Sequence, residues 1–125
     1  MRRMPWARAL GAAAAGFLLL GCWGCAPAEE NSQAAAATEQ GKAQYDMHCA
    51  ACHEDTKLDL AKKPPKLDGL FERGSLPSGA PATEEQVRKT ILEGRGIMPP
   101  FGQSLSKEDL DDLMAYLRTK GKREK

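Results

Sequence analysis

Two cysteines and a histidine near the middle of the chain constrain its fold more than any other feature. Cys49 and Cys52 stand three positions apart, and His53 directly follows the second thiol. This is the C-x-x-C-H pattern of covalent haem attachment, in which the thiols form thioethers with the two vinyl groups of the porphyrin. The histidine then provides the first axial ligand to the iron. A chain that uses this motif to attach haem has to fold around a large, flat, apolar group.

The pentapeptide alone leaves other chemistries open. C-x-x-C pairs also form redox disulfides and zinc sites. Cys22 and Cys25, taken together with Cys49 and Cys52, give C-x2-C-x23-C-x2-C, which is near zinc-ribbon spacing. A zinc module would require a cytosolic protein whose apolar leader is structural. A thiol–disulfide oxidoreductase would require a βαβ pattern, and no strand pattern is evident in the sequence. The rest of the chain favours haem over both.

The amino terminus has the pattern of an export signal. Three arginines within the first eight residues precede an apolar run that ends at Leu20. The run is shorter than the roughly 20 apolar residues that a membrane-spanning helix needs. It continues into Leu19-Leu20-Gly21-Cys22, which resembles a bacterial lipobox. We therefore expect residues 1–21 to be a lipoprotein-type signal and Cys22 to be lipidated on the periplasmic side of a bacterial membrane.

Two other outcomes stay open at this end of the chain. Ala26-Pro27-Ala28 is an A-x-A site, and cleavage after Ala28 would release a soluble periplasmic protein. An uncleaved signal would remain as an anchor. All three outcomes place the rest of the chain outside the cytoplasm.

Composition divides the remainder into three parts. Residues 22–37 are small, polar and alanine-rich, which predicts a flexible tether. Residues 38–120 form the compact domain, and residues 121–125 form a basic tail that begins beside Lys120. A domain of this size has a modest core and commonly needs a disulfide or a cofactor. With Cys49 and Cys52 assigned to haem, no cysteine pair is left in the domain, and a buried haem would supply the missing apolar volume.

Periodicity and capping signals predict an all-α fold with three main helices. The first covers residues 38–47, although Gly41 is costly inside a helix and suggests a closely crossing neighbour. The second begins at Thr83 and stops at Gly94, and residues 54–82 before it are rich in loops. The third begins at Ser106, whose hydroxyl can cap the amide of the residue three positions on.

The second axial ligand is expected from a loop. Two adjacent prolines follow Met98, and glycines stand at positions 94, 96 and 102, so this segment cannot form a regular helix. A thioether presented on such a loop can reach a soft iron centre, and His/Met ligation raises the reduction potential. Met98 is therefore expected as a haem ligand. His48 is expected to face solvent and to leave the iron to His53.

Four segments in sequence order make residues 38–120 resemble a class I c-type cytochrome with one haem. They are residues 41–45, 49–53, 64–71 and 96–101, and residues 113–117 support them. The resemblance implies a cytochrome c fold in which the first and last helices cross near a right angle at Gly41, with Tyr45 packing toward Leu113 and Tyr116.

The resemblance also implies roles for two loop residues. The carbonyl of Pro65 would accept a hydrogen bond from the Nδ1–H of His53, which orients the ring. Arg73 would contact a haem propionate.

The function implied is outer-sphere electron transfer by a monomeric, non-enzymatic protein with no catalytic residue and no nucleic-acid partner. Its donors and acceptors would be membrane respiratory complexes or periplasmic dehydrogenases, which dock near Ile97, Pro99 and Phe101. A haem-based sensor or weak peroxidase with a labile sixth ligand is the alternative. The chain has 18 Lys and Arg against 17 Asp and Glu, and loss of the three leader arginines reverses the balance to −2. We therefore expect no broad basic field that steers acidic partners.

Overall fold

The computed structural model describes residues 28–54 and 59–121. The helical segments in these ranges are α1 (Ala28–His48), α2 (Ala50–His53), the 3-10 turn η1 (Leu70–Arg73), α3 (Glu84–Glu93) and α4 (Lys107–Thr119). Within the same ranges the only β pairings are isolated bridges, Ser75 with Pro81 and Arg95 with Met98. The predicted all-α class is confirmed. None of the described helices is both long and apolar enough to cross a bilayer.

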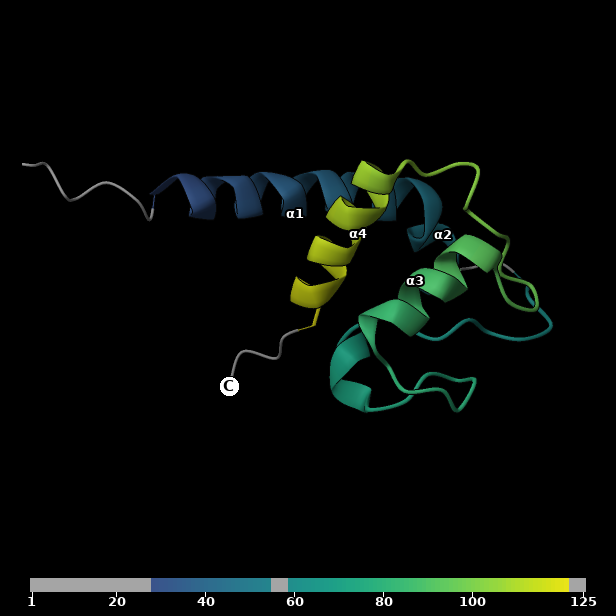
Figure 1. Ribbon diagram of the computed structural model, residues 1–125. Helices are drawn as coiled ribbons and strands as arrows, with labels where there is room; N and C mark the ends of the chain where they lie inside the picture. The colour runs from purple at the N-terminus through teal and green to yellow at the C-terminus, as the bar shows by residue number, and fades with distance from the viewer. Residues whose placement is uncertain (1–27, 55–58, 122–125) are drawn as a thin grey trace, which may run out of the picture.

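The first helix is longer than predicted. α1 begins at Ala28 instead of Thr38, so residues 28–37, expected as tether, are helical. Four consecutive alanines at 34–37 have the highest helix propensity, and two glutamates in the first turn favour the positive end of the helix dipole. This half of α1 extends past the crossing with α4 (Figure 1), and its side chains are exposed from Glu29 to Ala36. This half of α1 has no apolar stripe, so the hydrophobic periodicity of the sequence does not predict it.

The crossing of α1 and α4 depends on Gly41. A Cβ atom built on Gly41 would lie 1.9 Å from the carbonyl oxygen of Asp112 on α4. Only a glycine lets the two backbones approach this closely. One turn later Tyr45 is 1% exposed, and its ring centroid lies 5.2 Å from that of Tyr116. The predicted crossing at Gly41, with Tyr45 packed against α4, is confirmed (Figure 1).

The hydrophobic core lies where α1, α3 and α4 meet. Val87 and Ile91, the predicted stripe of α3, are buried in one cluster with the apolar face of α4: Leu110, Leu113, Met114 and Leu117. Both helix starts are as predicted. Thr83 accepts the N–H of Gln86 at the start of α3, and Ser106 forms a reciprocal capping box with Asp109 at the start of α4. These caps fix where α3 begins and where the loop that carries Met98 ends.

Two short elements were not predicted. The attachment motif itself forms the single helical turn α2, which follows α1 after Cys49. The turn η1 lies within the predicted loop region and is preceded by Gly69 in the left-handed conformation, with φ +63°. The N–H of Gly69 donates to the carbonyl of Lys120 at 3.1 Å, so the end of α4 is joined to this loop.

Candidate haem site

A cavity of about 450 Å³ opens between α2, η1, α3 and the Met98 loop. Its size is within the range of roughly 300–1,000 Å³ found for small-molecule and cofactor sites. The wall is mostly apolar and includes Leu67, Leu70 and Ile91. All the site residues predicted from the sequence within the described ranges line this one cavity: Cys49, Cys52, His53, Pro65, Arg73 and Met98. Cys22, the predicted lipidation site, lies outside the described residues.

The helical turn α2 directs both thiols toward the cavity. The N–H of Cys49 donates to the carbonyl of Tyr45 at 2.8 Å, and the N–H of His53 donates to the carbonyl of Cys49 at 2.9 Å. Cys49 is buried, Cys52 is half-buried, and both are free thiols. Burial, reinforced by the neighbouring Cys52, raises the pKa of Cys49 to about 11. A thiol with so high a pKa is poorly suited to disulfide exchange, because the thiolate is the nucleophile.

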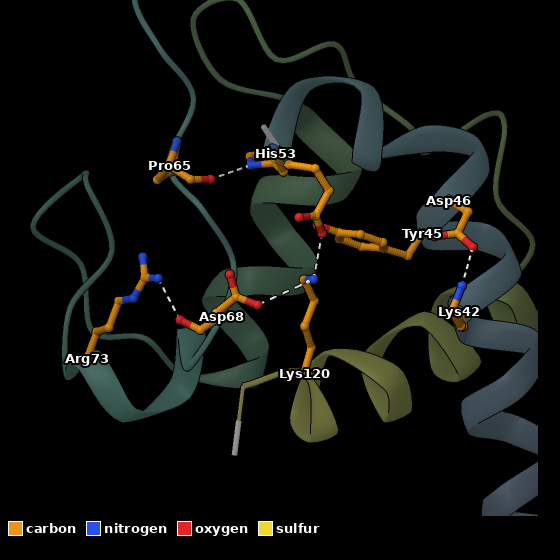
Figure 2. Close-up of polar contacts among 9 residues, drawn as sticks. Lys42, Tyr45, Asp46, His53, Pro65, Asp68, Arg73 and Lys120 are labelled. Atoms are coloured by element: carbon orange, nitrogen blue, oxygen red, sulfur yellow. Dashed lines mark hydrogen bonds and ion pairs between the residues drawn. The ribbon is translucent and has the colours of Figure 1, made fainter. Parts of the chain in front are cut away.

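His53 has a fixed orientation and a fixed tautomer. Its Nδ1 lies 2.7 Å from the carbonyl oxygen of Pro65 (Figure 2). A carbonyl oxygen only accepts, so in this hydrogen bond Nδ1 carries the proton and donates it. In the neutral ring this leaves the lone pair on the other nitrogen, Nε2, for binding a metal. This is the arrangement by which protein carbonyls orient metal-binding histidines and raise their basicity.

Met98 lies on a tight turn, as the glycines and prolines predicted. Arg95 and Met98 exchange two backbone hydrogen bonds, of 2.9 and 3.0 Å, around Gly96. Gly94 has φ +72°, and a Cβ there would lie 2.6 Å from the carbonyl oxygen of Met98. The N–H of Phe101 donates to the carbonyl of Ile91 at 3.0 Å, which holds the far end of the loop on α3. The Met98 side chain is half-buried against the core.

His48 lies elsewhere than predicted. It was expected to face solvent, but it is half-buried and lines the cavity. Its ring meets Phe101 edge to face, with the centroids 5.7 Å apart. The reason is helical geometry, because His48 is three residues after the buried Tyr45 and shares its face of α1.

Lys120, the last residue of the predicted compact domain, takes part in a polar network. Its side chain is only 11% exposed, and Nζ lies 2.6 Å from Glu54 Oε1 and 3.4 Å from Asp68 Oδ1. Figure 2 shows this ammonium between Tyr45 and Asp68. The hydroxyl of Tyr45 donates to Glu54 at 2.8 Å, and the Lys120 ammonium stands 4.7 Å from the centre of the Tyr45 ring. Contacts from Tyr45 and Lys120 therefore hold Glu54, the residue that directly follows His53, in place.

Arg73 lines the cavity from the end of η1. Its Nη2 donates to the backbone carbonyl of Asp68 at 2.5 Å (Figure 2). This hydrogen bond holds the guanidinium near the cavity, where its remaining N–H groups suit a carboxylate.

Residues 36–117 match the family described as "Cytochrome C oxidase, cbb3-type, subunit III". The chain belongs to the cytochrome c family. It is 36% identical over 99 residues to the cbb3-type cytochrome c oxidase subunit CcoP of Azospirillum brasilense, covering 74% of this chain and 31% of that protein. It therefore spans about a third of the length of that relative.

Shorter relatives match over most of their length. The chain is 32% identical over 85 residues to cytochrome c6 of a Picosynechococcus strain, covering 66% of this chain and 73% of the relative. It is 36% identical over 87 residues to cytochrome c-554(547) of Halothiobacillus neapolitanus, covering 63% and 91%. The solved structure of cytochrome c6 from the diatom Phaeodactylum tricornutum has the same fold, with a TM-score of 0.52 at 24% identity over 66% of this chain and 91% of that one.

Membership in the cytochrome c family implies one covalently bound haem c. The cavity of this chain fits that group. Two free thiols, an imidazole with its Nε2 lone pair available and a thioether line it together. The expected cofactor and fold are therefore confirmed.

Proposed function

We propose that Cys49 and Cys52 form the two thioether bonds to the haem and that His53 and Met98 are its axial ligands. The convergence of these four sulfur and nitrogen groups on one cavity supports this assignment. Bound haem supplies the one-electron couple of its iron. The chain contributes a fixed ligand geometry, which limits the reorganisation that accompanies electron transfer.

Each ligand has a second element that holds it in place. Pro65 orients the His53 ring through its carbonyl, and Gly94 and Arg95 hold the backbone of Met98. If His53 and Met98 both bind the iron, they would leave it no position for a substrate. We therefore assign electron transfer and no enzymatic activity. Arg73 is assigned to a propionate as its charged partner.

The redox partners are proposed to meet the protein outside the cytoplasm. The similarity to a cbb3-type oxidase subunit supports respiratory electron transfer at a bacterial membrane, with the respiratory complexes or periplasmic dehydrogenases as donors and acceptors. Lipid at Cys22 would hold the carrier there, whereas cleavage after Ala28 would leave it soluble in the periplasm. Ile97 is 62% exposed at the cavity, and with Pro99 and Phe101 it offers an apolar contact to a partner.

The test is a pair of absorption spectra, oxidised and reduced, of protein matured in a host that attaches c-type haem. The expected result is covalent haem, a c-type reduced spectrum and the weak long-wavelength band of iron–methionine ligation in the oxidised protein. Met98→Ala should lose this band. Met47→Ala is the matched control, because Met47 is 72% exposed on α1 and does not line the cavity.

The other outcomes separate the alternatives. Haem without the methionine band, combined with carbon monoxide binding by the ferrous protein, would indicate a sensor or weak peroxidase with a labile sixth ligand. Absence of covalent haem would overturn the proposal and return attention to a zinc or dithiol site.

A further inference from the structure

The hydrogen bond that orients His53 joins two segments twelve positions apart in the sequence, and it lies at the surface. Nδ1 of His53 is 2.7 Å from the carbonyl oxygen of Pro65, and Pro65 is exposed. Water can compete for both groups, so such a bond adds little net free energy by itself. Its persistence therefore depends on what else holds the two segments together.

The side chain of Lys120 bridges these two segments. Its ammonium lies 2.6 Å from Glu54, the residue after His53. It also lies 3.4 Å from Asp68, three residues after Pro65 (Figure 2). The Lys120 side chain is only 11% exposed, whereas the two carboxylate side chains are 43% and 52% exposed. Exposed ion pairs contribute little, but an ammonium that is sheltered and held from two sides is less weakened by solvent.

The backbone at the end of α4 contacts the same loop. The N–H of Gly69 donates to the carbonyl of Lys120 at 3.1 Å, and the N–H of Lys120 donates to the carbonyl of Tyr116 at 2.9 Å. Gly121 has φ +86°, and a Cβ there would lie 2.2 Å from the nitrogen of Gly69, so only glycine permits this approach. The Lys120 side chain therefore starts from a backbone that is already fixed against the loop, and its bridge costs less conformational entropy.

We propose that Lys120 is a positioning residue for the axial histidine, because it holds together the segments that carry the two partners of the His53–Pro65 hydrogen bond. This inference rests on the proposed assignment of His53 as a haem ligand. The bridge keeps the Pro65 carbonyl within reach of Nδ1 and thereby keeps the other ring nitrogen basic. Hydrogen bonding to an axial ligand is one of the means by which a protein sets the potential of a haem iron. Lys120 therefore influences the reduction potential through the orientation of His53.

The first test measures how fast the Nδ1 proton of His53 exchanges with deuterium in the reduced holoprotein, by nuclear magnetic resonance. Exchange requires the hydrogen bond to open, so its rate reports local separation of the two segments. Lys120→Met should accelerate the exchange several-fold. Lys107→Met is the matched control, because Lys107 also forms an ion pair on α4, with Asp111, and does not line the cavity. The amide of the fully buried Leu113 reports global opening and should be unaffected.

Asp68→Asn tests the second contact of the bridge with less risk to folding. The Asp68 side chain is 52% exposed, and the substitution leaves the contact between Lys120 and Glu54 in place. The Nδ1 proton should exchange faster than in the wild type, though by less than in Lys120→Met. Asp46→Asn is the control, because Asp46 is 54% exposed and also pairs with a lysine, on α1. Equal exchange rates in the two Asp→Asn variants would overturn the bridge to Asp68.

The reduction potential separates positioning from charge. Loss of a nearby positive charge alone lowers the potential, because a cation favours the less positive, reduced iron. A weaker hydrogen bond makes the imidazole less basic and raises the potential. Lys120→Met should therefore raise the potential, whereas Lys107→Met should not.

Three results would overturn the positioning role: equal exchange at His53 in the two Lys→Met variants, equal acceleration at His53 and Leu113, or a lowered potential in Lys120→Met. Covalent haem and the iron–methionine band are recorded for every variant, because they test the proposed function separately. A holoprotein that keeps both but shows none of the expected changes disproves the role of Lys120 and leaves the electron-transfer function intact.

Discussion

The Lys120 ammonium lies 2.6 Å from Glu54 Oε1 and joins the end of α4 to the residue that directly follows His53. The hydrogen bond from Lys120, and next the one from Tyr45, hold the pKa of the Glu54 carboxyl below its ordinary value. Burial alone would lower the pKa of Lys120, but Glu54 and the neighbouring groups outweigh it and raise the pKa. When both groups are charged, the Glu54–Lys120 pair therefore stabilises the side of the cavity next to His53.

Glu54→Gln should make stability less dependent on pH in the acid range. Because the pKa of Glu54 is depressed in the folded state, its contribution is complete above the ordinary carboxyl value of about 4.3 and is lost as the pH falls below it. Since Glu54 is partly exposed, the loss at pH 7 should be about 0.5–1 kcal/mol. Denaturant unfolding of the holoprotein at neutral pH and near pH 3 checks this, with Glu72→Gln as the control. If the difference in the free energy of unfolding between wild type and Glu54→Gln is as large near pH 3 as at neutral pH, the proposed role of the Glu54 carboxylate is wrong.

Gly41→Ala should destabilise the protein although alanine favours helices. The new methyl group would meet the backbone of Asp112 at 1.9 Å, and a backbone atom cannot move aside as a flexible side chain can. The gain of about 1 kcal/mol in helix propensity is then outweighed by separation of α1 from α4, with a net loss of roughly 1–3 kcal/mol. Thermal unfolding of the holoprotein measures this. Gln40→Ala, at the adjacent exposed position, should be nearly neutral.

Gly94→Ala should disturb the Met98 ligand, whereas Gly79→Ala should not. Both glycines have positive φ, so both substitutions cost backbone strain of about 1–2 kcal/mol. Only at Gly94 would the methyl group also strike the Met98 loop, 2.6 Å from its carbonyl oxygen; nothing lies within 4 Å of the corresponding position at Gly79. We expect weakening of the iron–methionine band and a lower reduction potential for Gly94→Ala alone. Identical spectra for the two variants would mean that the loop does not position Met98.

Cys22→Ser tests membrane attachment. If Cys22 is lipidated, the substitution should abolish the lipid-dependent increase in the mass of the mature protein and move it from the membrane to the soluble fraction. Cys25→Ser provides the matched control three residues away. Wild-type protein with an N-terminus at Glu29 would show instead that the A-x-A site is used.

Local patterns predicted the parts of the site that local chemistry determines. The C-x-x-C-H motif specified Cys49, Cys52 and His53, and the prolines and glycines around Met98 predicted its loop. The Pro65 contact came from resemblance alone, because nothing in a loop proline shows which histidine its carbonyl will face. The pairing of Lys120 with Glu54 was missed because the two are 66 residues apart and meet only through the fold.

The basic side chains of the cavity lining and the long first helix escaped prediction for different reasons. Total charge hides where charges lie, so a nearly neutral composition did not reveal that Lys62, Lys63 and Arg95 share one cavity. The start of α1 was placed too late because its first half packs against nothing described. Propensity, and not an apolar face, accounts for that helix.

The exposed half of α1 turns most of the expected tether into a rigid arm. Thirteen helical residues precede Gly41, a length of about 20 Å at 1.5 Å per residue. From Cys22 to Ala28 the chain spans at most about 20 Å when fully extended. In a protein lipidated at Cys22, the helix and the segment before it would each add up to about 20 Å to the height of the haem above the bilayer, and the helical share would vary less than a coil of the same number of residues. Such a carrier would reach only complexes whose electron entry sites lie within that combined height.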